Sequence, residues 1–147
     1  MTLLVGDYVP STATWVRDQV EEYEASGGAK ANTLRGGTDP IVVITSVGRK
    51  SGALRKNPLM RVERGGKYLA VASIGGGPTN PEWYHNFLAN PFVELQDGPV
   101  PKLYRARELQ GAERADWWAY AVETWPTYGR YQQKTERLIP IFVLEEI

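Results

Sequence analysis

The sequence predicts a mainly β fold with peripheral helices (α+β), an antiparallel sheet that we expect to close into a small barrel. Short β-branched and apolar runs recur along the chain, separated by glycine- or proline-containing turns of hairpin length. The helical segments do not alternate with the strands in a βαβ rhythm, which argues against a parallel sheet. Closing an antiparallel sheet removes its exposed edges. The expected order is helix, three strands, helix, two strands, helix and strand.

The first expected element is a helix with Ser11 or Thr12 as its N-cap, running to about Ser26. Serine and threonine are favoured N-caps, and the Gly27–Gly28 pair ends the helical pattern. One face of this helix carries the apolar residues Trp15, Val16, Val20 and Tyr23. The next segment, AKANTLRGGTDP, is polar and contains glycine, as linkers do. We therefore expect one domain over residues 1–147, with residues 1–40 appended to the barrel as a helix and a linker.

Three strands are expected between residues 41 and 73. Ile41–Ser46 is almost wholly apolar and β-branched, which indicates a buried strand. The turn GRKSG leads to a second strand, Leu54–Val62, in which Pro58 indicates an edge position or a bulge. The turn RGGK then forms a hairpin with Tyr68–Ser73.

The second half begins with a helix, PEWYHNFLAN, for which Asn80 is the expected N-cap and Pro81 the first residue. A hairpin around DGPVPK follows, then a helix that Pro126 ends, a short helix in TYGRYQQKTER, and a last strand, IFVLEE. The hairpin strands are Phe92–Gln96 and Leu103–Glu108.

Composition excludes several kinds of chemistry. The chain has no cysteine, which removes thiolate nucleophiles and sulfur-ligated metals, and its single histidine, His85, has no metal-ligand spacing around it. No metal is therefore expected. The 17 basic residues are balanced by 17 acidic ones, and no aromatic platform flanks the basic turn, so nucleic acid is not expected as a partner. An enzyme with this inventory would import its difficult chemistry in a cofactor.

The N-terminus lacks a basic region and a cleavage site, and the chain has no apolar run of about 18 residues. We expect a cytoplasmic protein, a monomer or a homodimer. Peripheral contact with the inner face of the plasma membrane stays open as an alternative. It would use the apolar residues Leu3, Leu4, Val5, Trp15 and Val16.

Positive charge is concentrated in and after the GRKSG turn. Between Arg49 and Lys67 there are seven basic residues and one acidic residue, Glu63. Gly48 and Gly52 permit positive φ angles, which can aim backbone N–H groups into an anion-binding concavity. A phosphate or a group of carboxylates fits such a turn, and a solvated hairpin explains the same residues equally well.

The loop IGGGPTN gives a second candidate ligand contact. Three consecutive glycines, Gly75 to Gly77, leave backbone that a planar ring could approach closely. The helix that follows offers free N–H groups to a second anionic point. A flexible loop before a capped helix is the ordinary alternative.

Three blocks of the sequence share their order with one known family. They are TSVGRKSGALRKNPL (45–59), VASIGGGPTNPEWYHNFLANP (71–91) and WPTYGRYQQKTERLIPI (125–141). Together they resemble the deazaflavin (F420)-dependent nitroreductase family of actinobacteria, over about residues 40–143. The resemblance implies a split β-barrel of the FMN-binding-like type, with about six antiparallel strands and N-terminal, central and C-terminal helices. It also implies an F420H2-dependent reductase that transfers a hydride to a small organic acceptor, a quinone, enone or nitro compound.

The resemblance also implies roles for individual residues. The F420 phosphate and acidic tail would contact Arg49, Lys50, Ser51 and Arg55. The deazaflavin ring would lie between Asn57, Pro58 and Leu59 on one side and Ala72, Ser73, Gly75 and Gly76 on the other, with Trp83 behind. Tyr128 and Tyr131 would be catalytic, in a substrate pocket that also includes Met60 and Trp125. Being three residues apart, the two tyrosines would project from one side of a helical turn.

Three positions depart from the family's nitroimidazole-reducing member. Ile74 stands where that member has a lysine, and Met60 and Trp125 each replace a tyrosine. We therefore expect F420 binding to be retained and the range of acceptors to differ. The alternatives are an FMN-dependent split-barrel oxidoreductase, which would use the same cations for a phosphate, and a non-catalytic module that stores F420.

Overall fold

The computed structural model describes residues 4–147, so Leu3 lies outside the described residues. It contains four α-helices and seven strands within this range. The helices are α1 (Thr14–Ala25), α2 (Glu82–Ala89), α3 (Gly111–Thr124) and α4 (Thr127–Lys134). The strands are β1 (Ile41–Val47), β2 (Leu54–Met60), β3 (Glu63–Arg64), β4 (Lys67–Val71), β5 (Phe92–Gln96), β6 (Pro101–Glu108) and β7 (Ile141–Glu146). Two short 3₁₀ turns, η1 (Leu34–Gly36) and η2 (Ile74–Gly76), complete them.

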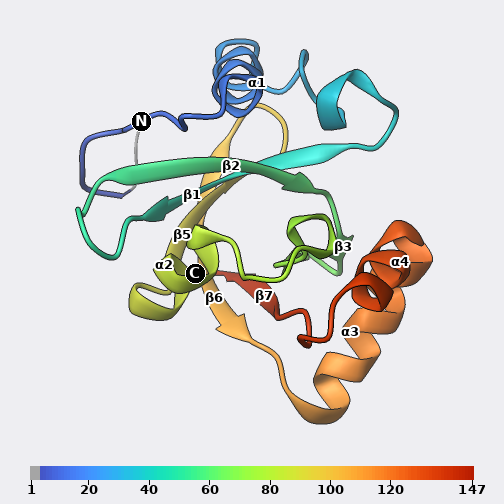
Figure 1. Cartoon of the computed structure of the whole chain (residues 1–147). Coiled ribbons are helices and arrows are strands. Elements are labelled where there is room, and N and C mark those ends of the chain that lie inside the picture. Colours follow the sequence, from blue (N-terminus) through green and yellow to red (C-terminus); the bar gives the residue numbers. More distant parts are fainter. Residues whose placement is uncertain (1–3) are drawn as a thin grey trace.

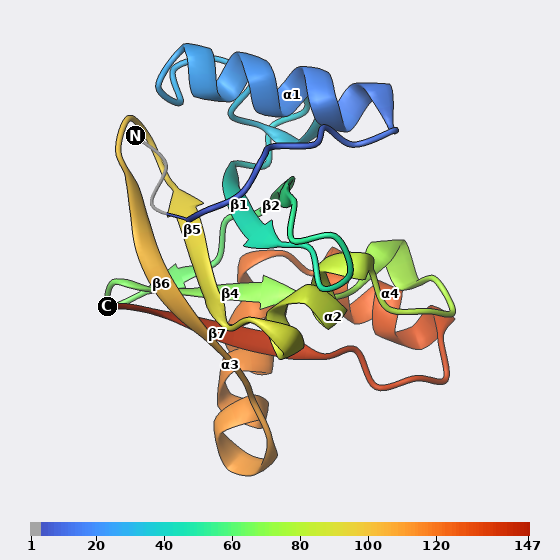
Figure 2. The ribbon, with the colours of Figure 1, turned by 90° about the vertical axis from the view of Figure 1, so that its left-hand side faces the viewer.

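All strands belong to one antiparallel sheet in the order β2-β1-β5-β6-β7-β4-β3. The sheet curls into a half-barrel, with α1 over β1 and β2 and with α3 and α4 on the opposite side (Figure 1). Figure 2 shows the same curled sheet after a quarter turn, with the long β5–β6 hairpin along one side of it. The predicted antiparallel barrel-like fold with peripheral helices is confirmed.

The strand predicted over Leu54–Val62 is divided, which is one reason for seven strands where about six were expected. The Arg61 N–H donates to the carbonyl of Pro40 at 3.0 Å, whereas the Val62 carbonyl accepts from Leu69 at 2.9 Å. The chain thus changes its partner from the β1 side to β4 between these two residues. Short-range sequence patterns do not show such a change of partner.

Pro58 lies in the edge strand β2, opposite Val43, and the register from Leu54 to Met60 is unbroken. The edge position was predicted correctly, and no bulge forms. An edge strand accepts proline because one of its sides has no neighbouring strand to receive an N–H group.

Both helix starts differ from the predictions. α1 begins at Thr14 with Ala13 as its N-cap, because the Ser11 hydroxyl accepts the Ala13 N–H at 3.1 Å and so belongs to the preceding turn. α2 begins at Glu82 with Pro81 as its N-cap. The Asn80 side chain instead accepts a hydrogen bond from Arg137 at 2.7 Å.

Strand β1 is apolar on both faces because each face is covered. Val42 and Ile44 point into the barrel core with Trp83 and Phe87 of α2, whereas Ile41 and Val43 pack against α1. A third cluster joins α3 and α4 to the far side of the sheet, including Met60, Leu69, Trp117, Tyr128 and Ile139. The apolar run of β1 therefore positions both α1 and α2.

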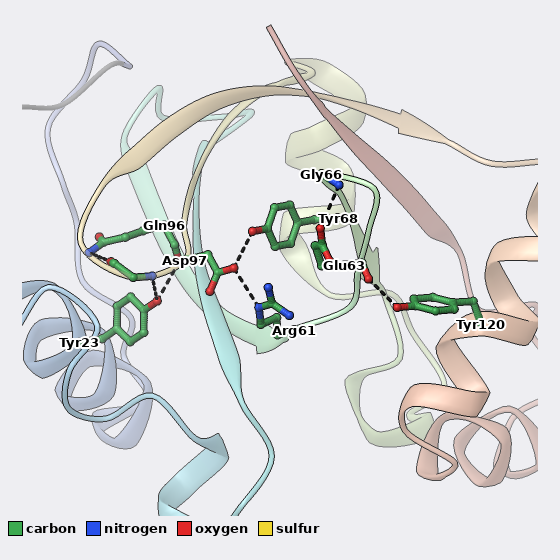
Figure 3. A network of polar contacts seen from close by, with 9 residues as sticks. Tyr23, Arg61, Glu63, Gly66, Tyr68, Gln96, Asp97 and Tyr120 are labelled. Carbon is green, nitrogen blue, oxygen red and sulfur yellow. Dashed lines mark hydrogen bonds and ion pairs between the residues drawn. The ribbon is translucent and has the colours of Figure 1, made fainter.

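A polar network ties the β5–β6 turn to the rest of the barrel (Figure 3). Asp97 accepts hydrogen bonds from the Arg61 guanidinium at 2.9 Å and from the Tyr68 hydroxyl at 2.5 Å. The Tyr23 hydroxyl donates to the Gln96 carbonyl at 3.1 Å and accepts from the Gly98 N–H at 2.8 Å. The turn is thus held by α1 on one side and by the β2–β4 region on the other.

Candidate active site

Two adjoining hollows form one groove beside β2. One, the cationic hollow, has a volume of about 440 Å³ and is lined by the β1–β2 turn and the start of α2. The other, the aromatic hollow, has a volume of about 540 Å³ and extends between β2, η2, α1 and α4. Four residues line both: Asn57, Ile74, Pro81 and Trp83. A long ligand could therefore occupy both hollows at once.

The residues predicted to contact the F420 phosphate and acidic tail all line the cationic hollow: Arg49, Lys50, Ser51 and Arg55. Their turn is rigidly built, because the Gly48 N–H donates to Ala53 at 2.7 Å and the Arg49 N–H donates to the buried Asn86 side chain at 3.0 Å. The Gly52 N–H donates to Gly48, and the Ser51 hydroxyl accepts the Ala53 N–H. The N–H groups of Gly48, Arg49, Gly52 and Ala53 are thus bonded within the protein, which leaves mainly the side chains of the turn to hold an anion.

The cations of this hollow differ in how far acidic groups neutralise them. Lys56 forms an ion pair with Glu24, and Arg49 lies 3.9 Å from Glu82. Within residues 4–147, no ion pair involves Lys50 or Arg55. The hollow thus keeps uncompensated positive charge, which an anionic ligand could neutralise.

The η2 loop forms the wall shared by the two hollows. Ile74, Gly75 and Gly76 have φ angles of 43°, 67° and 80°, three left-handed residues in succession. A β-branched residue rarely adopts this conformation, so surrounding contacts must hold Ile74 there. A Cβ on Gly76 would lie 2.7 Å from the Tyr131 carbonyl oxygen, so the loop packs directly on the backbone of α4.

Arg137 fixes this loop, and sequence reasoning did not identify it. Its guanidinium donates to the carbonyls of Gly77 and Ser73, both at 2.9 Å, and to the Asn80 side chain at 2.7 Å. Burial lowers the pKa of Arg137 from its ordinary value. Its three partners are about 60 residues away in the sequence, and no local pattern indicates them.

Aromatic side chains form one wall of the aromatic hollow. The ring centroids of Trp125 and Tyr128 are 4.9 Å apart, and those of Tyr128 and Tyr131 are 6.5 Å apart. Both tyrosines belong to α4, as the predicted helical turn requires. Burial, with a smaller contribution from Tyr131, raises the pKa of Tyr128. Within residues 4–147 neither phenol group has a hydrogen-bond partner, so both could bind a ligand oxygen.

Most of the predicted ring and substrate contacts also line the groove. They are Asn57, Pro58, Leu59, Met60, Ser73, Gly75, Trp83, Trp125, Tyr128 and Tyr131. Ala72 instead lies fully buried in the barrel core, and its N–H donates to the Pro140 carbonyl at 2.9 Å. Gly76, the last residue of η2, faces the backbone of α4 and does not line the groove. The lining residues that were not assigned to the groove include Trp15 and Val16 of α1, and Leu34 and Arg35 of η1.

A split barrel whose groove joins unpaired cations to an aromatic wall has the features that an oxidoreductase of the flavin and deazaflavin class needs. Residues 15–146 match the family model of F420H2-dependent quinone reductases, and the chain belongs to that family. It is therefore an F420H2-dependent oxidoreductase with F420 as its cofactor, which confirms the prediction made from the three sequence blocks.

Individual relatives agree with this assignment. An F420H2-dependent quinone reductase of Mycobacterium tuberculosis is 37% identical over 111 residues, which are 74% of this chain and 74% of that protein. A solved F420H2-dependent reductase, FDR-A, is 55% identical, with a TM-score of 0.68 over 72% of this chain and 94% of that one. A solved structure described as a domain-swapped dimer is 48% identical, with a TM-score of 0.71 over 92% of this chain and 100% of that one.

Proposed function

We propose that F420 lies along the groove, with its phosphate and acidic tail in the cationic hollow and its ring beside the shared wall. The observation that supports this placement is the continuity of the two hollows, one with uncompensated cations and one with aromatic rings. Arg49, Lys50 and Arg55 supply charge, and the Ser51 hydroxyl can still donate while it accepts the Ala53 N–H. Arginine forks match phosphate and carboxylate oxygens well, because they form paired, charge-assisted hydrogen bonds.

Bound F420H2 supplies the hydride, and the protein positions the acceptor next to the cofactor and excludes water from the groove. Pro58 and Leu59 of β2 line the aromatic hollow together with Ser73 and Gly75, and these two pairs would flank the ring. Tyr128 and Tyr131 of α4 can donate hydrogen bonds to an acceptor carbonyl and so orient it. This arrangement fits a quinone acceptor, as the M. tuberculosis relative's name indicates for that protein. Enones and nitro compounds present similar oxygens and stay predictions.

A fluorescence titration with F420 and with FMN tests the cofactor placement. We expect F420 to bind more tightly, because its phosphate and longer anionic tail can together engage more of the cations Arg49, Lys50 and Arg55 than the single phosphate of FMN can. Steady-state turnover of F420H2 with menadione is measured on the same protein, because an enzyme turns over and a storage module does not. Tighter binding of FMN would favour the FMN-dependent alternative. Tight F420 binding without turnover of any quinone, enone or nitro compound would favour storage.

We further propose that the chain forms a homodimer in the cytoplasm and contacts the membrane peripherally. The structure that is 48% identical and described as a domain-swapped dimer supports the homodimer.

The exposed fractions of Val5 (93%) and Trp15 (40%) support the membrane contact. No helix within residues 4–147 is long and apolar enough to cross a membrane. Light scattering measures the mass in solution, and flotation with anionic vesicles measures the contact.

A further inference from the structure

The aromatic hollow contains one charged side chain among the described residues that line it, Arg35. The remaining lining is apolar, aromatic or neutral, and none of it is acidic. A single guanidinium in such surroundings is not explained by F420 binding, because the cations proposed for the phosphate and tail lie in the other hollow.

Arg35 is held in place by its backbone and by Trp15. Its guanidinium lies 4.5 Å from the centroid of the Trp15 ring. Its backbone is left-handed, with φ 49° and ψ 38°. The buried Gln19 braces this loop by donating to the carbonyls of Ala31 at 3.0 Å and Thr33 at 2.6 Å. Arg35 is exposed to solvent, and the braced loop with the Trp15 contact favours a position of its guanidinium beside the aromatic hollow, where α1 and η1 line it.

No carboxylate neutralises this charge. Within residues 4–147, no ion pair of 4.0 Å or less involves Arg35. Two acidic side chains, Asp18 and Glu22, line a separate outer hollow that Trp15 and Arg35 also border. An anion approaching from that outer side would meet like charge, whereas the aromatic hollow presents the guanidinium with no acidic neighbour in its lining.

We propose that Arg35 is a specificity residue that selects aromatic acceptors bearing an anionic substituent, a carboxylate or a sulfonate. The acceptor's ring would lie among the aromatic side chains of the hollow, and its anionic group would pair with the guanidinium fork, whose face Trp15 supports. The proposal rests on the acceptor occupying the aromatic hollow, as proposed above.

Two readouts test it on the same variants. The first is the selectivity ratio, kcat/KM for an ortho-naphthoquinone sulfonate divided by kcat/KM for the parent ortho-naphthoquinone, with F420H2 as donor. The second is the Kd of naphthalenesulfonate, which cannot be reduced, measured by tryptophan fluorescence. In Arg35→Asn we expect the ratio to fall about tenfold and the Kd to rise about tenfold, the size expected for one lost charge-assisted hydrogen bond. Asparagine tolerates the left-handed backbone better than most residues.

Two further variants keep the result interpretable. Arg35→Lys retains the charge without the fork and should give intermediate values. Arg114→Gln is the matched control, since Arg114 lies 5.5 Å over the Trp118 ring and neither residue lines the groove; its ratio and Kd should equal the wild-type values. A ratio and a Kd that Arg35→Asn leaves unchanged would overturn the proposal while the reductase function stands. If Arg35→Asn raises the Kd of naphthalenesulfonate but the wild-type protein reduces no quinone, the role of Arg35 would stand and the proposed quinone reduction would be refuted.

Discussion

At the scale of single residues, the groove relies on hydroxyl and guanidinium groups that have few partners within the protein. Tyr128 is almost completely buried, and its raised pKa keeps the phenol protonated throughout the physiological range. Tyr131 is partly exposed in the same hollow. Both can therefore donate a hydrogen bond to an acceptor oxygen, and Tyr131 is the more accessible of the two.

Replacing Tyr131 by Phe tests this role, because it keeps the ring and removes the hydroxyl. We expect menadione turnover with F420H2 to fall at least about tenfold, the low end for a lost proton contact in the transition state. F420 affinity, measured by titration, should stay at the wild-type value. Tyr128→Phe should behave similarly. Wild-type turnover in both variants would show that the two rings only close the groove.

At the scale of elements, the η2 loop depends on one side chain of another segment. Arg137 bonds Ser73, Gly77 and Asn80 at once, and this explains how a strained run of left-handed residues stays ordered between the hollows. A lysine cannot reproduce three contacts in a planar fork.

Arg137→Lys should therefore weaken both stability and F420 binding. Since hydrogen bonds to a charged group contribute about 1.5–3 kcal/mol each and some will persist, we expect a loss of about 2 kcal/mol in the free energy of unfolding. Urea denaturation measures it, and titration measures the accompanying loss of F420 affinity. Arg130→Lys is the matched control, because Arg130 is exposed and bonds only the neighbouring Thr127 hydroxyl among the described residues. Equal stability of the two variants would exclude the role of Arg137.

The same contacts show what local sequence could and could not predict. The β1–β2 hairpin, the Pro58 edge strand and the Tyr128–Tyr131 spacing follow from short-range rules, and they were correct. The Asn80 cap was wrong because a distant arginine takes the side chain that the local pattern assigns to α2. The sequence did not predict that Trp15 of α1 and Arg35 of η1 line the groove. Tertiary packing of these two elements beside β2 brings them there, and no motif indicates it.

At the scale of the whole molecule, the barrel depends on the network around Asp97 (Figure 3). It links the β5–β6 turn to Arg61, which lies between β2 and β3, and to Tyr68 of β4. Burial, together with the hydrogen bond to Asp97, raises the pKa of Tyr68 far above its ordinary value. The neutral phenol is thus the form that the folded barrel requires.

Tyr68→Phe should lower the free energy of unfolding by about 1.5 kcal/mol near pH 7. Because the folded-state pKa is raised, the contribution of Tyr68 is complete below about pH 10, the unfolded value, and declines as the pH rises above it. The gap between wild type and variant should therefore narrow near about pH 11, measured by urea denaturation at both pH values. Tyr120→Phe is the control variant, because it removes a tyrosine hydroxyl that donates to an uncharged acceptor, the backbone carbonyl of Glu63, at 2.6 Å. A gap independent of pH would contradict this role.

The groove's central property, that its cationic hollow binds the anionic part of F420, is tested most directly by F420 affinity in Arg49→Ala/Lys50→Ala. We expect the double variant to bind F420 at least about 100-fold more weakly, since two charge-assisted hydrogen bonds at about 1.5 kcal/mol each are lost. Wild-type affinity should also fall as salt is raised, and it should fall less steeply in the variant, because fewer exposed charge pairs are left to screen. An unchanged affinity and an unchanged salt dependence in the double variant would show that F420 binds elsewhere.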